Sequence, residues 1–333
     1  MRQAVQNAWL RRGLLAWLLW PLSLAFRALV ALRKRLYRTG RFRSERLPVP
    51  VIVVGNVVAG GAGKTPVLLS LLEHLAARGM RAGVISRGYG RSSGDCLYVT
   101  ANSEPEHVGD EPLLIQRAAA VPVVVARKRI DAGRALLTAH PGVQVIVCDD
   151  GLQHLALQRD IELCVFDARG VGNGWLQPAG PLREPWPRPV DFVLAPARFA
   201  AAHKGYSVER ELAPLVCNSA GERIPLATLR GKSLLAVAGI GNPASFFAML
   251  RDQGLTLECT FALPDHYDFG GAPLPLDPAT AVVCTEKDAA KLWRSRPDAW
   301  AVPLVVRIDP AFWPAFDRRL DAKLSSVHGS ETA

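Results

Sequence analysis

Short apolar runs alternate with segments of helical periodicity through most of the 333-residue chain. The runs are rich in Val, Ile and Leu, whereas the segments between them place apolar residues three or four positions apart. Continuous apolar runs are typical of strands buried on both faces, and their alternation with helices predicts βαβ units. We therefore predict an α/β fold with a doubly wound, mostly parallel sheet. The predicted strands are 51–54, 82–86, 121–125, 143–148, 162–166 and 192–195, and the predicted helices are 66–78, 111–120 and 129–139.

Residues 170–190 interrupt this alternation with a stretch rich in Gly, Pro and Trp. We predict a loop here, and a loop of this length in a compact domain usually carries function. The β/α pattern resumes at 233–238 and includes a helix near 243–253 and a strand at 281–284. The chain is thus predicted to have three regions: an N-terminal helix within 1–46, a main domain over 47–227 and a smaller C-terminal α/β domain over 228–325.

The net charge of +10 is concentrated at the N-terminus. Residues 1–46 contain eleven Lys and Arg and one Glu, whereas the rest of the chain contains 29 basic and 29 acidic side chains. A nucleic-acid-binding domain needs a basic face on its folded body. The neutral body therefore argues against a nucleic-acid partner.

The same N-terminal region is apolar and aromatic. Residues 13–26 carry no charge and include Trp17 and Trp20, but fourteen helical residues cover only about 21 Å of a roughly 30 Å hydrocarbon core. We interpret the region as an amphipathic helix in the membrane interface, with Trp at the headgroups and Arg and Lys on anionic lipid. Two alternatives are a tilted insertion that extends to Leu32 and a helix packed on its own protein.

The six cysteines are scattered, and none forms a Cys-x-x-Cys or Cys/His spacing typical of zinc sites. At least three lie in apolar, strand-like runs. We interpret them as small core residues of a protein in a reducing compartment.

The segment 49–79 carries the clearest chemical signal, because a buried strand, a glycine-rich turn and a helix follow one another there. Glycines at 60, 61 and 63 allow backbone N–H groups to surround phosphates, and the helix dipole favours negative charge at the same place. Lys64 would reach the β- and γ-phosphates, and the Thr65 hydroxyl would bind Mg²⁺. Val58 stands where the strict motif has Gly. The segment predicts a P-loop NTPase-like fold and makes 47–227 the nucleotide-binding and catalytic domain.

Two adjacent carboxylates, Asp149 and Asp150, follow the predicted strand 143–148. An acidic residue at the end of such a strand holds Mg²⁺ in nucleotide-binding α/β proteins, directly or through water. An ordinary Asp-Gly turn is the alternative. The phosphate loop upstream favours the metal site.

Four further motifs are ambiguous when each is taken alone. Asp110 in GDEP has the position of a helix N-cap, and Thr285 in TEKDA also suits a cap. His266 in PDHY fits an exposed loop, and Arg183-Glu184 lies in the Pro-rich loop with no distinguishing pattern.

Taken in order, the motifs are specific. The set GGAGKTP, SRGYGR, GDEP, DDGLQH, GPLREP, PDHYDF and TEKDA resembles the tetraacyldisaccharide 4′-kinase family of lipid A synthesis. The resemblance extends from about residue 9 to 320, includes the amphipathic N-terminus, and shares the Val58 departure from the strict phosphate loop.

The resemblance implies transfer of the γ-phosphoryl group of ATP, with Mg²⁺, to the 4′-hydroxyl of a tetraacylated glucosamine disaccharide 1-phosphate. It implies that Asp110 is the base that accepts the hydroxyl proton, that His266 pairs with Asp110, and that Lys64 is also catalytic. The implied nucleotide-binding residues are Asn56, Gly60, Gly61, Ala62, Gly63, Lys64 and Thr65. The implied metal ligands are Thr65, Asp149 and Asp150, and Arg183 and Glu184 belong to the surroundings of the site.

The acylated substrate also implies the location and partners of the protein. Four acyl chains hold the substrate in a bilayer, so the enzyme is expected at the cytoplasmic face of the bacterial inner membrane, peripheral or monotopic, with an anionic membrane surface and no obligate protein partner. The basic N-terminal segment and the cluster 127–129 are both candidates to meet the 1-phosphate, the cluster being equally consistent with a solvated loop. A nucleotide-dependent switch or metallochaperone-type GTPase is the main alternative function, and a membrane scaffold with a degenerate nucleotide site is a third.

Overall fold

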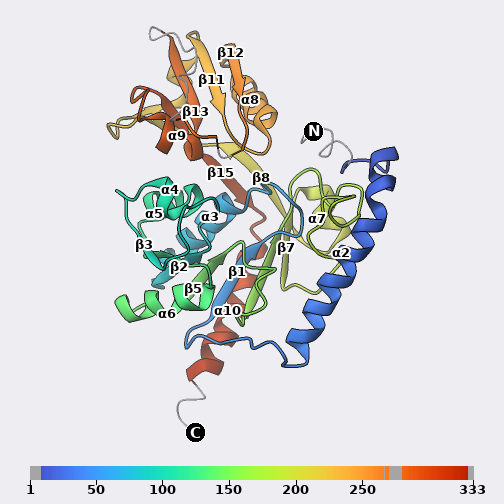
Figure 1. Ribbon diagram of the computed structural model, residues 1–333. Helices are drawn as coiled ribbons and strands as arrows, with labels where there is room; N and C mark the ends of the chain where they lie inside the picture. Colours follow the sequence, from blue (N-terminus) through green and yellow to red (C-terminus); the bar gives the residue numbers. More distant parts are fainter. Residues whose placement is uncertain (1–8, 266, 270–279, 329–333) are drawn as a thin grey trace.

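A computed structural model describes residues 9–265, 267–269 and 280–328 of the chain, and its two sheets lie one above the other (Figure 1). The larger sheet has nine strands in the order β15-β8-β7-β6-β1-β5-β2-β4-β3. The central strands pair in parallel, and the edge strands β15 and β3 pair antiparallel to their neighbours. The strands are β1 (Val51–Gly55), β2 (Ala82–Ser86), β3 (Leu97–Val99), β4 (Val123–Val125), β5 (Val145–Asp149), β6 (Ile161–Val165), β7 (Phe192–Ala195), β8 (Tyr206–Leu212) and β15 (Leu304–Ile308).

Helices cover both faces of this sheet, as the fold prediction required. One face packs on α3 (Lys64–Ala77), α5 (Asp110–Ala119) and α10 (Phe312–His328), where leucines of α3 meet Phe312 and Phe316 of α10. The other face packs on α6 (Arg129–Ala139) and α7 (Ala197–Ala202). The prediction of a doubly wound α/β fold is confirmed, and the short helix α4 (Pro105–Val108) leads into α5.

The smaller sheet has six strands in the order β10-β9-β14-β13-β11-β12. Leucine and phenylalanine side chains of α8 (Pro243–Asp252) fill one of its faces, and α9 (Glu286–Leu292) covers the other. Its elements are β9 (Leu215–Cys217), β10 (Arg223–Pro225), the 3₁₀ turn η1 (Leu226–Leu229), β11 (Ser233–Ala238), β12 (Thr256–Ala262), β13 (Ala281–Thr285) and β14 (Trp300–Val302).

The sheets divide the chain differently from the predicted boundaries of 47–227 and 228–325. The small sheet begins at β9, and after β14 the chain returns to the large sheet as β15 and α10, with Leu304 opposite Leu212. Two neighbouring crossings therefore join the sheets, where Ala213 N donates to Pro303 O at 2.9 Å. A five-residue, mostly apolar strand such as β15 does not reveal from its sequence which sheet it will join, and this is why the return to the large sheet was not predicted.

The N-terminal helix α2 spans Leu14–Arg38 and lies along the side of the molecule (Figure 1). It is longer than the uncharged segment 13–26. Among the described residues, it is the one helix that is long and apolar enough to cross a membrane. Ser23 fixes it to the body, since its hydroxyl donates to Leu176 O at 2.7 Å and accepts from Ala179 N at 3.0 Å.

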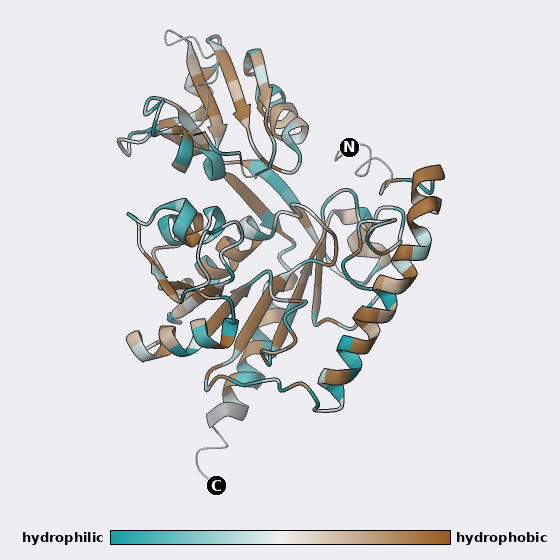
Figure 2. Ribbon diagram, viewed as in Figure 1, coloured by the Kyte–Doolittle hydropathy of each residue, from teal (hydrophilic) through white to brown (hydrophobic). Residues whose placement is uncertain are grey.

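Contact with the body covers only a narrow stripe of α2. Ala16 and Ser23 are buried, whereas Leu14, Leu18 and Leu29 are 80%, 68% and 64% exposed. Figure 2 shows apolar residues along most of the helix. The helix thus combines docking on its own protein with an apolar surface that the protein leaves uncovered.

Candidate active site

The phosphate loop joins β1 to α3 and has the backbone shape that its sequence predicts. Gly60 and Gly63 have φ of +91° and +72°, in the left-handed region that other residues rarely adopt. A Cβ on Gly63 would also lie 2.6 Å from the Arg210 guanidinium. Gly63 is the N-cap of α3, so Lys64 and Thr65 open the helix where its unpaired N–H groups and dipole attract anions.

Two arginines from distant strands and loops hold this phosphate loop. Arg210 of β8 donates to Ala62 O at 2.5 Å, and Arg169 donates to Gly61 O at 3.0 Å. These two hydrogen bonds to carbonyl oxygens fix the backbone of the loop. Sequence reasoning missed both residues, because neither lies in a recognisable motif.

The paired aspartates lie at the end of β5, beside the phosphate loop, because β5 pairs with β1 and places Asp149 opposite Val54. Lys64 Nζ lies 3.6 Å from Asp150 Oδ1, and Arg183 Nη1 lies 2.9 Å from Asp150 Oδ2. Asp149 is 2% exposed, and its Oδ2 accepts from Ser86 Oγ at 3.0 Å. Its Oδ1 is buried and has no hydrogen-bond partner among the described residues.

The two carboxyl groups have opposite electrostatic environments. Burial, together with the negative charge of Glu111, raises the pKa of Asp149 to about 7. Burial acts in the same direction on Asp150, but Lys64 and Arg183 outweigh it and hold the pKa of Asp150 below its ordinary value. A cation beside Asp149 Oδ1 would supply the charge that this buried oxygen lacks.

The carboxylate oxygens of Asp149 and Asp150 suit Mg²⁺, which takes part of its ligands from substrate and water, better than a metal ion whose ligands all come from the protein. No three His, Cys, Asp or Glu side chains gather into a metal-binding group within the described residues. Mg²⁺ is commonly held by one or two carboxylates together with substrate phosphates and water. Asp149, Asp150 and the Thr65 hydroxyl at the start of α3 match that donor set.

Asn56 lies inside the phosphate loop and is fully buried. Its Nδ2 donates to Val58 O at 2.7 Å, its backbone oxygen accepts from Gln153 Nε2 at 3.0 Å, and its Oδ1 has no partner in the described part of the chain. The structure thus gives Asn56 a bracing contact, and its predicted nucleotide contact stays a prediction.

The predicted pair Arg183-Glu184 divides between two tasks. Arg183 binds Asp150, and its backbone N donates to Val57 O at 2.7 Å. Glu184 is 2% exposed and accepts from Gln153 Nε2 at 2.8 Å, while Lys34 of α2 lies 2.5 Å from its Oε2. Arg188 adds a second cation at 3.3 Å. Glu184 therefore links the N-terminal helix to the turn that carries the aspartates.

Replacing Glu184 by Gln is expected to lower the free energy of unfolding by about 1–3 kcal/mol at pH 7, the usual cost of an unsatisfied buried partner. Burial raises the pKa of Glu184, but Lys34, Arg188 and Gln153 outweigh it and hold this pKa below 4.5. The stabilisation is therefore present above pH 4.5 and is lost as the pH falls through the folded-state pKa. Thermal unfolding in detergent should show that the difference in melting temperature between the parent and Glu184→Gln shrinks from pH 7 to pH 3. A difference that stays constant would contradict this account.

The cluster 127–129 separates into exposed and buried members. Arg127 and Lys128 are exposed, but Arg129 is 6% exposed and donates to the backbone oxygens of Asp149 and Asp150 at 3.1 and 2.7 Å. Arg129 thus supports the aspartate turn from inside. Arg127 and Lys128 keep the exposure that a phosphate-binding or a solvated role would need.

Asp110 is the first residue of α5, and it is not the N-cap, which is Gly109. Its carboxylate oxygens lie 2.9 and 3.0 Å from Lys291 Nζ, a lysine of α9 in the small sheet. The predicted pairing of Asp110 with His266 lies outside the described residues. The cap predicted for TEKDA is present, since Thr285 Oγ1 accepts from Asp288 N at 3.2 Å.

The small sheet also reaches the phosphate loop directly. The turn between β11 and α8 places Gly241 so close that a Cβ there would lie 3.3 Å from Gly61 N. Phosphate loop, aspartate turn and Asp110 thus belong to the large sheet, while Gly241 and Lys291 approach them from the small one. The arrangement offers oxygen and N–H groups suited to a metal-nucleotide, and it holds the Asp110 carboxylate between the two sheets.

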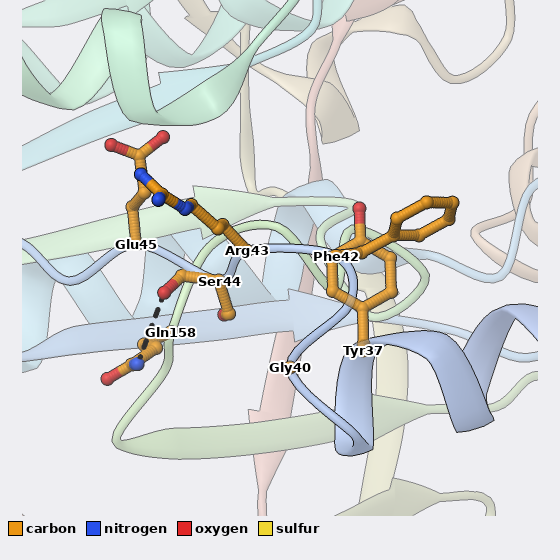
Figure 3. A pocket seen from close by; sticks show the side chains of 7 residues that line it. All are labelled: Tyr37, Gly40, Phe42, Arg43, Ser44, Glu45 and Gln158. Carbon is orange, nitrogen blue, oxygen red and sulfur yellow. Dashed lines mark hydrogen bonds between the residues drawn. The ribbon is translucent and has the colours of Figure 1, made fainter.

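A separate open hollow of about 530 Å³ lies at the C-terminal end of α2 (Figure 3). The rings of Tyr37 and Phe42 lie 5.3 Å apart at its rim, and Gln158 Nε2 donates to Ser44 O at 3.3 Å. None of its lining residues belongs to the nucleotide motifs. The hollow adjoins the basic end of the helix and is not part of the candidate active site.

Comparison with known proteins agrees with this geometry. The family model described as tetraacyldisaccharide-1-P 4′-kinase matches residues 15–325. A tetraacyldisaccharide 4′-kinase of Acidovorax sp. (strain JS42) is 57% identical over 329 residues, which cover 98% of this chain and 97% of that protein. The enzyme of the same name from Delftia acidovorans is 53% identical over 96% of this chain and 95% of its own.

A solved structure has the same fold. The crystal structure described as the "apo" form of LpxK from Aquifex aeolicus in complex with ATP matches with a TM-score of 0.79 and 28% identity. The match covers 92% of this chain and all of the other.

Proposed function

The chain belongs to the tetraacyldisaccharide-1-P 4′-kinase family, and we propose how its residues divide the work of that reaction. It is an ATP-dependent kinase that phosphorylates the 4′-hydroxyl of tetraacyldisaccharide 1-phosphate, a lipid A precursor. The GTPase alternative has no support, since the relatives named above are kinases. The roles of individual residues, the membrane surface and the cytoplasmic location are our proposals.

The phosphate loop and the aspartate turn bind the metal-nucleotide. Backbone N–H groups of residues 60–63 and the Lys64 ammonium hold the phosphates, and Thr65, Asp149 and Asp150 would hold Mg²⁺. When bound, Mg²⁺ neutralises charge on the phosphate oxygens during transfer. The observation that supports this assignment is the contact of Lys64 with Asp150 beside the unpartnered Asp149 Oδ1. Arg183 keeps Asp150 oriented, and Asn56 braces the loop.

Asp110 is the base in this proposal. Phosphoryl transfer requires an aligned nucleophile, and a carboxylate that accepts the hydroxyl proton supplies both alignment and proton transfer. The proton of the acceptor 4′-hydroxyl passes to an Asp110 oxygen as the bond from that hydroxyl oxygen to the γ-phosphorus forms. The bond from the γ-phosphorus to the β–γ bridging oxygen breaks in the same transfer, and ADP leaves. His266 would pair with this carboxylate.

The exposed apolar surface of α2 supports a position on a membrane, and we assign it to the cytoplasmic face of the inner membrane because the enzyme uses ATP. Burial of an acyl chain contributes about 0.8 kcal/mol for each CH₂ group, so four chains keep the substrate in the bilayer. An enzyme that uses ATP must meet that substrate at the surface. The leucines of α2 would enter the bilayer, and its arginines would contact anionic headgroups.

Transfer of labelled γ-phosphate from ATP to tetraacyldisaccharide 1-phosphate in detergent micelles tests the function. We expect a lipid product labelled at the 4′ position and little turnover of ATP without lipid. Hydrolysis of ATP at equal rates with and without lipid, and no labelled lipid, would contradict the assignment.

Replacing Leu18 by Ser should weaken binding to vesicles that contain anionic lipid about tenfold, because part of the roughly 1.5–3 kcal/mol gained by burying a leucine is lost. Leu18 is 68% exposed on α2. Leu215→Ser is the matched control, since Leu215 is 46% exposed on the small sheet, and it should leave vesicle binding unchanged. Equal binding of both variants in a flotation assay would show that α2 does not enter the bilayer.

A further inference from the structure

We propose that Lys291 is a positioning residue for the carboxylate of Asp110, delivered by α9 from the small sheet. The inference rests on the proposed role of Asp110 as the base. Lys291 Nζ lies 2.9 Å from one oxygen of Asp110 and 3.0 Å from the other. Both side chains are nearly buried, at 12% and 8% exposure.

Two lysines of α9 and an arginine in the turn after it form a row of cations. Lys287 and Lys291 are four positions apart on one side of α9, and Arg294 follows three positions later, beyond the end of the helix at Leu292. Arg294 binds both oxygens of Glu106, the residue four before Asp110, with two contacts of 2.9 Å. Acidic residues of α4 and α5 therefore face basic residues of α9 and of the turn after it across the junction of the two sheets.

The start of α9 is firmly fixed, so the position of Lys291 is defined by the small sheet. Asp288 is 4% exposed, and its Oδ2 accepts from Gly239 N at 2.9 Å and from Thr285 Oγ1 at 2.5 Å. Gly239 directly follows β11, and Thr285 ends β13. The helix is thus tied to two strands of its own sheet, and Lys291 follows one turn later.

A lysine in this place suits the demands on a base. Each carboxylate oxygen has two acceptor sites, so Lys291 can occupy one and leave another for the acceptor hydroxyl. The ammonium contacts both oxygens and so fixes the direction of the carboxylate. Since Lys291 belongs to the small sheet, Asp110 receives this contact only while the two sheets are docked. Correct alignment of the base therefore depends on docking of the small sheet.

Substitution of Lys291 tests the proposal in the lipid phosphorylation assay with the full-length enzyme. We expect Lys291→Met to lower kcat about 10- to 50-fold, within the roughly hundredfold that an ångström of misplacement can cost, and to change the KM for ATP less than about twofold. Lys291→Arg keeps the cation and should recover most of kcat. Arg294→Met removes another contact across the same junction without touching Asp110, and its kcat should stay within about threefold of the parent because that pair is exposed.

Two results would overturn the inference: an unchanged kcat in Lys291→Met, or equal losses in Lys291→Met and Arg294→Met. Melting temperatures identify a variant that fails to fold. If Lys291→Met does not fold, Lys291→Arg and Lys291→Gln replace it in the comparison with the parent. A kcat that is unchanged in Lys291→Arg and strongly lowered in Lys291→Gln supports a role of the charge, and equal kcat values in both variants contradict it.

A double-mutant cycle separates this inference from the assignment of the base. In an Asp110→Asn background, Lys291→Met should lower kcat less than about twofold further, because contacting residues are not additive. A full additional loss would mean that Lys291 acts elsewhere. Normal turnover of Asp110→Asn alone would instead refute Asp110 as the base.

Discussion

Replacing Asp110 by Asn is expected to lower kcat for lipid phosphorylation by about 10²- to 10⁴-fold, the range that a positioned base contributes. The amide has nearly the shape of the carboxylate but cannot accept the hydroxyl proton. The phosphate loop, more than forty residues earlier in the chain, keeps its own contacts with Arg169 and Arg210. The variant should therefore bind ATP nearly as the parent does, as measured by titration with a fluorescent nucleotide.

Asp131→Asn is the matched control for this substitution. Asp131 is exposed in the first turn of α6, away from Lys291, and its replacement should leave kcat unchanged. Asp110→Asn removes the charged partner of Lys291. Thermal unfolding of both variants measures how far this loss lowers stability, separately from its effect on kcat. If the kcat of Asp110→Asn lies within about threefold of the parent's, the loss is far smaller than expected, and another group must accept the proton.

The parts of the site that were predictable lie in continuous segments. The phosphate loop, the helix that follows it and the paired aspartates are each recognisable from a few neighbouring residues, because the backbone and the side chains that bind phosphate must be close together in the chain. The strand that carries Asp149 was also visible as an apolar run. Its position beside β1 was visible only in the structure, because β2, β3 and β4 lie between the two strands in the chain.

The residues that sequence reasoning missed act across long separations. Arg169, Arg210 and Lys291 each contact a segment more than 100 residues away in the chain. A single Lys or Arg has the same local sequence pattern whether its side chain is solvated or paired, so no periodicity distinguishes the two cases. Only the folded arrangement brings these cations to the phosphate loop and to Asp110.

The N-terminal helix shows a different limit. Charged residues from Arg27 onward were taken to interrupt the apolar segment, but α2 continues to Arg38. Long basic side chains favour helix and can keep their charges in water while their stems lie along apolar surface. The charges therefore limit the apolar surface without ending the helix, and the polar anchor at Ser23 could be seen only in the structure.

Replacing Lys64 by Met should lower kcat/KM for ATP by about 10²- to 10³-fold, the loss typical when one preorganised donor to a developing charge is removed. Lys64 is 8% exposed and lies 3.6 Å from Asp150, so methionine fills similar space without the cation. Unlike Asp110→Asn, this change should weaken nucleotide binding as well as transfer, because the ammonium is proposed to contact the phosphates in the ground state too.

Lys232→Met, an exposed lysine in the turn before β11, is the matched control and should behave as the parent. Measuring ATP binding and phosphate transfer in parallel distinguishes the two sides of the site. Loss of both in Lys64→Met, with loss of transfer alone in Asp110→Asn, is expected if the large sheet binds the nucleotide at its phosphate loop and activates the lipid hydroxyl at α5. ATP binding by Lys64→Met that equals the parent would mean that the phosphates lie elsewhere, and the assignment of the loop between β1 and α3 would fail.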